Sequence, residues 1–92
     1  MKYFDWPIDK NEKLISERGI SFEKAVWHIE NGDVLDIIDH PNRSRYPNQK
    51  MFIIKIDDYV YCVPFVESDS TVFLKTIFAS RNLTNKYLGA KS

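Results

Sequence analysis

The chain has 92 residues, enough for one compact domain over residues 1–92, and its 13 basic side chains balance 13 acidic ones. Because a chain of this length buries only about 60 to 65% of the surface that it exposes when unfolded, a deep enclosed cavity is not expected. The balanced charge also argues against a global attraction to nucleic acid or to an anionic membrane, so any such binding must come from local clusters.

Cysteine, glycine and apolar runs exclude several further classes of protein. The single cysteine, Cys62, cannot form an internal disulfide or a cysteine-rich zinc site, so a reduced compartment fits best. No apolar stretch approaches the roughly 20 residues of a membrane-spanning helix. The three glycines do not form a phosphate-cradling pattern, and no cofactor is expected. These observations predict a cytoplasmic protein without a membrane association.

The N-terminal third predicts a short strand and a first helix. Residues 3–6 are typical of an edge strand, which a proline ends. The helix is expected over residues 10–18, with Asp9 as its N-cap and Gly19 at the position of a C-cap glycine. Two apolar side chains of this helix should point inward, Leu14 and Ile15.

A second helix is expected from Ser21 to about Asn31. The Ser21 hydroxyl can cap the helix, and Glu23 is favourable in the first turn because of the helix dipole. Apolar residues recur in this segment at spacings of three and four, which indicates one buried helical stripe. They are Phe22, Ala25, Val26 and Ile29.

The rest of the chain predicts mainly strands. The apolar run at residues 34–38 is interpreted as a strand, although a run this short is also compatible with a helix. Segments rich in β-branched and aromatic residues follow at 51–56, 59–66 and 71–80, and a short helix is expected at 83–88. The predicted class is α+β, with two N-terminal helices on one face of a three- to four-stranded antiparallel sheet and a short C-terminal helix.

Counting outward from the turns assigns strand residues to two faces. We expect a two-residue turn at Asp57-Asp58 and a four-residue loop in the next hairpin. The helices should cover the more apolar face, formed by Phe52, Ile54, Ile56, Tyr59, Tyr61, Val63, Phe65, Val72, Leu74 and Phe78. The other face should carry Lys55, Lys75, Cys62 and Pro64. Its lysines suggest contact with water or a polar partner, and exposure of Met51, Ile53 and Phe73 would suit a protein interface.

The densest group of polar side chains lies at residues 40–50, between the strands predicted at 34–38 and 51–56. His40 can act as a general acid or base near neutral pH, and Tyr46 offers a ring for stacking. Three cations of the same segment can hold a phosphate: Arg43, Arg45 and Lys50. The alternative is a proline-braced surface loop whose charges are only solvated.

Metal binding has little support. His28 has no second histidine nearby and is interpreted as a partly buried packing residue of the second helix. Asp33, Asp36 and Asp39 are spaced by three residues, and such positions do not share one face of a strand. No metal site is therefore expected.

Three short motifs span most of the chain. They are FDW at 4–6 with DKN at 9–11, RGISFEKA at 18–25, and IFASR at 77–81 with Thr84 and Tyr87. In this order they resemble the BrnT-like toxins of bacterial type II toxin–antitoxin modules, which are related to the RelE/ParE-type ribonuclease fold. Relative to that family, Arg18 stands in place of a histidine and Thr76 in place of an arginine.

The resemblance implies a ribonuclease that cleaves RNA without a metal and that a small antitoxin neutralises, commonly a ribbon-helix-helix DNA-binding protein. Arg81 matches the arginine of the closing motif, and Lys50 matches a basic residue that opens a strand. With His40 as base or acid, these three residues form the expected catalytic set. Three further cations would position the RNA backbone: Arg43, Arg45 and Lys75.

A second reading stays open on the sequence alone. The same fold can serve as a non-catalytic protein-binding module, or as a decayed toxin that only binds its antitoxin. The zero net charge favours this reading, since a ribonuclease that relies on phosphate contacts usually carries a positive excess.

Overall fold

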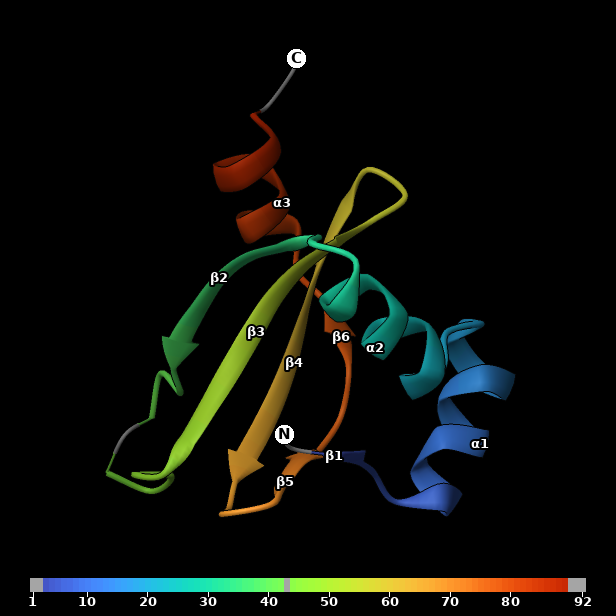
Figure 1. The fold of residues 1–92 in the computed structure, drawn as a ribbon. Coiled ribbons are helices and arrows are strands. Elements are labelled where there is room, and N and C mark those ends of the chain that lie inside the picture. The colour runs from blue at the N-terminus through green and yellow to red at the C-terminus, as the bar shows by residue number, and fades with distance from the viewer. Residues whose placement is uncertain (1–2, 43, 90–92) are drawn as a thin grey trace.

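The computed structural model of the protein describes residues 3–42 and 44–89, which form an α+β fold as predicted (Figure 1). In chain order the elements are β1 (Tyr3–Asp5), α1 (Ile8–Arg18), α2 (Phe22–Glu30), β2 (Val34–Asp39), β3 (Gln49–Ile56), β4 (Tyr59–Glu67), β5 (Thr71–Leu74), β6 (Phe78–Ala79) and α3 (Arg81–Leu88). None of the helices in these two ranges is long and apolar enough to cross a membrane.

The six strands form one mixed sheet in the order β1-β5-β4-β3-β2, and β6 pairs with the other end of β4. β1 runs parallel to β5, whereas the other neighbours are antiparallel. The prediction of a three- to four-stranded antiparallel sheet is therefore wrong in strand number and in type. The strand expected over 71–80 is interrupted at 75–77 and becomes two strands, and the N-terminal strand adds the parallel pair.

α1 begins two residues before its predicted start. Pro7, which has no N–H group, takes the N-cap position, and Asp9 lies in the first turn instead. Gly19 ends the helix in the left-handed conformation with φ +68°, as predicted. Leu14 is buried, but Ile15 is 50% exposed, because neighbouring residues point about 100° apart and only a narrow stripe of α1 meets the core.

The buried side chain of Asn11 joins α1 to α2. Its Oδ1 accepts a hydrogen bond from Phe22 N at 2.7 Å, and its Nδ2 donates to Glu23 Oε1 at 2.8 Å. The Phe22 amide is an otherwise unpaired donor at the start of α2, so Asn11 caps that helix from outside. Ser21 supplies the predicted cap as well, since its hydroxyl accepts from Lys24 N at 3.1 Å.

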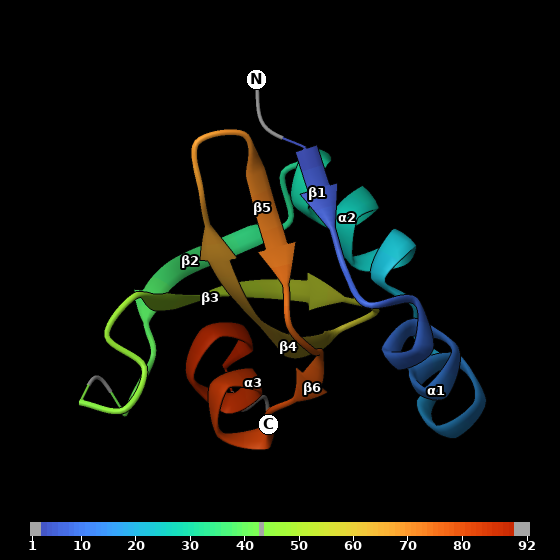
Figure 2. The same cartoon turned by 90° about the horizontal axis from the view of Figure 1, so that it is seen from below.

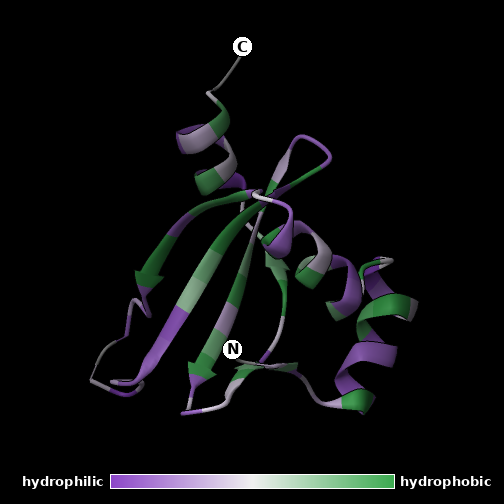
Figure 3. Ribbon diagram, viewed as in Figure 1, coloured by the Kyte–Doolittle hydropathy of each residue, from purple (hydrophilic) through white to green (hydrophobic). Residues whose placement is uncertain are grey.

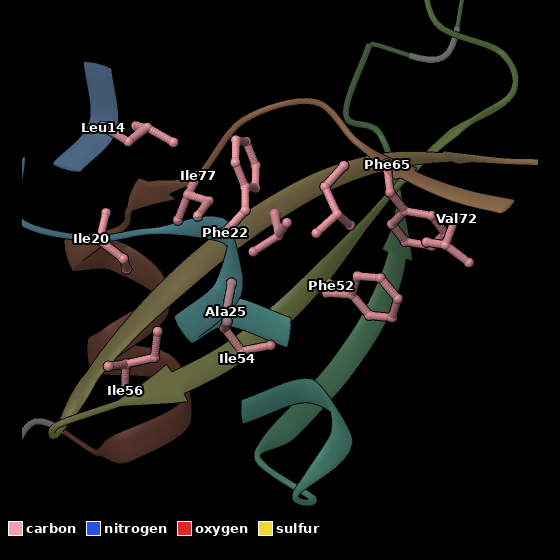
Figure 4. Packing of buried hydrophobic residues seen from close by; sticks show 12 residues of the cluster. Leu14, Ile20, Phe22, Ala25, Phe52, Ile54, Ile56, Phe65, Val72 and Ile77 are labelled. Atoms are coloured by element: carbon pink, nitrogen blue, oxygen red, sulfur yellow. The ribbon is translucent and has the colours of Figure 1, made fainter. Parts of the chain in front are cut away.

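The main core lies between the sheet and the first two helices (Figure 4). The predicted stripe of α2 is confirmed: Phe22 and Ala25 are fully buried, and Val26 and Ile29 are partly buried and pack against the main core. The sheet contributes residues that were assigned to this face: Phe52, Ile54, Ile56, Val63, Phe65, Val72 and Leu74. The assignment is correct because the turn at Asp57-Asp58 has two residues with positive φ, which sets the register of β3 and β4.

The expected position of Phe78 is wrong. Phe78 pairs with Cys62 and lies on the opposite face, whereas Ile77 is fully buried in the main core. The alternation of a continuous strand is lost where the chain leaves the sheet between β5 and β6. In that segment the Ile77 carbonyl accepts a hydrogen bond from Arg18 Nη1 at 2.9 Å.

α3 covers a smaller cluster on the opposite face of the sheet (Figure 2). The cluster consists of Met51, Ile53, Val60 and Cys62, against which Leu83, Tyr87 and Leu88 pack. The expectation that Met51 and Ile53 are exposed is therefore wrong, because α3 buries them. The helix begins two residues earlier than predicted, since the Ser80 hydroxyl caps it by accepting from Leu83 N at 3.2 Å.

Two hydrogen bonds fix α3 on the sheet. Val60 N donates to Thr84 Oγ1 at 2.9 Å, and Tyr87 Oη donates to Asp36 Oδ2 at 2.9 Å. The hydrogen bond to Asp36 raises the pKa of Tyr87, because only the protonated phenol can donate it. The short C-terminal helix is thus tied both to β4 and to β2.

Alkaline pH is expected to destabilise the fold through Cys62. Burial raises the pKa of this thiol from 9.0 to about 11, because the thiolate would lose its hydration. Below pH 9 the neutral thiol makes its full contribution to the free energy of unfolding. As the pH rises from 9 to about 11, this contribution of about 2 to 3 kcal/mol is lost. Urea denaturation on either side of this window should show the loss. An equal loss in Cys62→Ala would contradict the assignment.

Candidate nucleic-acid interface

α3 covers only part of its face of the sheet. The rest of this face, toward the loop between β2 and β3, is not covered by a helix (Figure 1). Cross-strand partners point to the same side of a sheet, so the strand register defines the surface. Gln49 pairs with Val66, and Val66 pairs with Phe73. His40 N donates to the Gln49 carbonyl at 2.9 Å, which extends the pairing of β2 with β3 by one residue. Lys75 N donates to the Pro64 carbonyl at 2.8 Å, which extends the pairing of β4 with β5 in the same way. We name this surface the open sheet face and define it by His40, Gln49, Val66, Phe73 and Lys75.

These five residues all reach solvent: Lys75 is exposed and the other four are partly exposed. The hydrophilic loop between β2 and β3 borders the surface on one side (Figure 3). β1 borders it on the other side, where Asp5 pairs with Phe73. The open sheet face is therefore a strip in which the apolar side chains of Val66 and Phe73 lie between polar ones.

A cation lies against an aromatic ring on each side of this strip. Lys75 Nζ lies 5.6 Å from the centroid of the Phe73 ring. Across the sheet, Arg45 Cζ lies 5.7 Å from the centroid of Tyr46, whose ring also packs against His40 with centroids 4.4 Å apart. Cations within about 6 Å of a ring are attracted to its face, so both rings are held beside a positive charge.

The loop fixes the tautomer of His40. Its Nδ1 accepts a hydrogen bond from Asn42 N at 3.0 Å, so the proton of the neutral ring is on Nε2. In this state Nε2 can donate a hydrogen bond to a phosphate oxygen. To accept a proton at Nε2 the neutral ring would have to change tautomer and give up the bond to Asn42.

Lys50 lies close to His40 in the sheet but on the other face. It follows Gln49 in β3 and pairs with Phe65, which belongs to the main core under α1 and α2. Because successive strand residues alternate, the exposed side chain of Lys50 starts from the side opposite to His40. The two predicted catalytic groups are therefore separated by the sheet itself.

Arg81 is separated from both of these residues along the sheet. It opens α3, directly after Ser80, whose N donates to the Val60 carbonyl at 3.0 Å. Val60 and Phe65 are five residues apart in β4, which corresponds to about 17 Å. Figure 1 shows the loop before β3 and the helix α3 at opposite ends of the sheet. The predicted set of His40, Lys50 and Arg81 therefore does not converge.

Two of the residues predicted to position RNA, unlike the predicted catalytic set, lie at or beside the same surface. Lys75 is part of the open sheet face, and Arg45 lies in the loop beside it. Arg43 lies outside the described residues. Sequence reasoning missed Gln49, which lies between His40 and Val66 on this surface, because the predicted strand begins only at Met51 and leaves Gln49 in the loop.

His28 lies away from this surface and has a structural partner. Its Nδ1 is 2.7 Å from Asp33 Oδ2, which links the end of α2 to the turn before β2. The ring also contacts Trp27 edge-on, with centroids 5.0 Å apart, so the prediction of a packing residue is confirmed. In the two described ranges, no three His, Cys, Asp or Glu side chains are placed to share a metal ion.

Comparison of the chain with models of protein families, with curated proteins and with solved structures finds no match.

Proposed function

We propose that the protein binds single-stranded RNA on the open sheet face and cleaves it, as a cytoplasmic ribonuclease toxin that a small antitoxin neutralises. One observation carries the RNA binding: the two pairs of ring and cation, Phe73 with Lys75 and Tyr46 with Arg45, on the two sides of one partly exposed strip. Exposed rings stack on unpaired bases, and neighbouring cations bind the phosphates that connect them.

The resemblance to the BrnT-like toxins supports cleavage. The reaction would be an in-line attack of a ribose 2′-hydroxyl on the adjacent phosphate, which breaks the bond to the 5′-oxygen of the next nucleotide and leaves a 2′,3′-cyclic phosphate. His40 would give up its bond to Asn42 and either take the proton of the 2′-hydroxyl or, when protonated, give one to the leaving 5′-oxygen, while cations stabilise the developing charge. Lys50 and Arg81 start from different faces and from opposite ends of β4. We therefore assign these two cations to different phosphates of one bound strand.

Inducible expression of the chain in a bacterial host is expected to arrest growth and to fragment total RNA. Lys50→Ala and Arg81→Ala should each abolish the arrest, because each removes a cation that holds the strand. His40→Ala should lower the rate of cleavage by purified protein and change its pH dependence. Growth curves and gel analysis of total RNA measure the first two effects, and cleavage rates across a pH series measure the third.

Lys24→Ala is the matched control for the two cation variants. Lys24 is an exposed lysine of α2 whose Nζ lies 3.8 Å from Asp57 Oδ2, so it lies at the end of β3 opposite to Lys50 and on the face of the sheet opposite to α3 and Arg81. This variant should arrest growth like the wild type. Unchanged toxicity of both Lys50→Ala and Arg81→Ala would refute their assignment, provided that circular dichroism shows intact folds.

One observation favours the second candidate function, a binding module without turnover. β2 is an edge strand of the sheet, and two of its apolar residues, Leu35 and Ile37, are 37% and 51% exposed. An extended segment of an antitoxin can pair with such an edge. The N–H group of Ile37 already donates to Asp36 Oδ1 at 2.8 Å, so a partner strand would pair with the other backbone groups of this edge. Normal growth with intact RNA, at confirmed soluble expression, would favour this function.

A further inference from the structure

The backbone of Gln49 is held between His40 and Val66 in the open sheet face. Its N donates to the Tyr46 carbonyl at 3.2 Å, and its carbonyl accepts from His40 N at 2.9 Å. On its other side Gln49 pairs with Val66 of β4. The backbone of this residue is thus fixed between the aromatic loop and the strand that leads to Phe73.

The side-chain amide of Gln49 is unused within the described residues. It is partly buried, yet neither its oxygen nor its nitrogen forms a hydrogen bond to any residue in 3–42 or 44–89. Other amides in structural positions are paired: Asn11 makes two side-chain bonds, and Asn31 Nδ2 donates to the Trp27 carbonyl at 2.7 Å. A half-desolvated amide with a free donor and a free acceptor is available for a ligand.

The chemistry of the amide selects a base rather than a phosphate. A phosphate offers only acceptors, which the NH₂ group could bind but which would leave the amide oxygen unpaired. Every nucleobase offers a donor next to an acceptor on its Watson–Crick edge, and adenine offers a second pair on its other edge, through N6 with N7, which is the pair that Gln and Asn amides bind with two hydrogen bonds. The cations Lys75 and Arg45 on either side provide the matching contacts for phosphates.

We propose that Gln49 reads one adenine of the bound strand, which stacks on a ring of the open sheet face while its edge pairs with the Gln49 amide. This inference rests on the proposed RNA binding and deepens it, because stacking and phosphate contacts alone tolerate every sequence. Gln49 is therefore the specificity-determining residue of the surface.

The test is fluorescence anisotropy with labelled hexanucleotides of adenosine, cytidine or uridine. Wild-type protein should bind the adenosine oligomer roughly fivefold or more tightly than the uridine oligomer. Gln49→Leu keeps the size of the side chain but removes the amide, and it should bring the two affinities within about twofold of each other. Gln49→Glu replaces the donor with an acceptor and should lose the adenosine preference, because a carboxylate can accept from N6 but cannot donate to N1 or N7. Asn85→Ala, an exposed amide of α3, should change nothing.

The outcomes separate this inference from the proposed function. Equal binding of the three oligomers by wild type, or an adenosine preference that survives in Gln49→Leu, would overturn the role of Gln49 and leave RNA binding intact. Absence of binding to all three would overturn both. If Gln49→Leu does not fold by circular dichroism, Gln49→Glu decides: retention of the wild-type adenosine preference would overturn the proposal.

Discussion

Asn11→Ala is expected to lower the free energy of unfolding by about 2 to 4 kcal/mol. The substitution removes the acceptor of the buried Phe22 amide and the donor to Glu23, at the joint of α1 and α2. A buried donor that loses its acceptor costs its full desolvation free energy, and the two helices that cover the main core lose their mutual alignment. Urea denaturation followed by circular dichroism measures the effect.

Two variants separate this mechanism from a general loss of polar contacts. Asn11→Asp keeps an acceptor for Phe22 N but places a second carboxylate beside Glu23, so it should be destabilising at neutral pH and less so in mild acid. Asn85→Ala removes an exposed amide from α3 and should stay within about 0.5 kcal/mol of wild type. A similarly small effect of Asn11→Ala would contradict the role of Asn11.

Phe73→Ala is expected to weaken the binding of a short single-stranded RNA by about 5- to 150-fold, the range found for loss of one base–aromatic stack. The ring lies in the open sheet face with Lys75 against it, so its removal takes away both a stacking surface and the group that orients the cation. Phe73→Leu should restore little of the affinity, because it retains apolar volume without a planar ring. Fluorescence anisotropy at fixed salt measures both variants.

The salt dependence of the affinity for RNA tests the same surface independently. Each phosphate contact to single-stranded RNA contributes about a 2.6-fold loss of affinity between 50 and 200 mM salt, so the loss for Lys75→Ala should be about 2.6-fold smaller than that for wild type. Lys24→Ala, on the opposite face, should keep the wild-type slope. Affinities of Phe73→Ala and Lys75→Ala equal to those of wild type would exclude the open sheet face as the RNA-binding surface.

Local features of this protein follow directly from short stretches of sequence. Gly19 ends α1, Ser21 caps α2, and the Asp57-Asp58 turn sets the register of β3 and β4. Each depends on interactions within about four residues, and the turn register then distributes the apolar side chains of the hairpin between two faces. The four-residue loop between Glu67 and Val72 likewise sets the register of β4 and β5, so the placement of Lys75 away from the main core was predictable.

Features that depend on distant segments were not predictable from the sequence. The parallel pairing of β1 with β5, and the break that places Phe78 beside Cys62, depend on how the chain closes on itself. The candidate site belongs to the same category. A strand that begins at Gln49 rather than at Met51 brings Gln49 into the sheet.

The sequence by itself determined the α+β class, the two N-terminal helices with their buried stripe, the hairpin turn and the polar loop that follows β2. Only the tertiary structure decided which of the loop and strand residues share a surface. Lys50 alternates away from His40, Arg81 begins a helix at the far end of β4, and Phe73 and Lys75 join His40 and Gln49 on one open face. The physical reason is that a side chain's face depends on the pairing of its strand, and that pairing is formed between residues far apart in the chain.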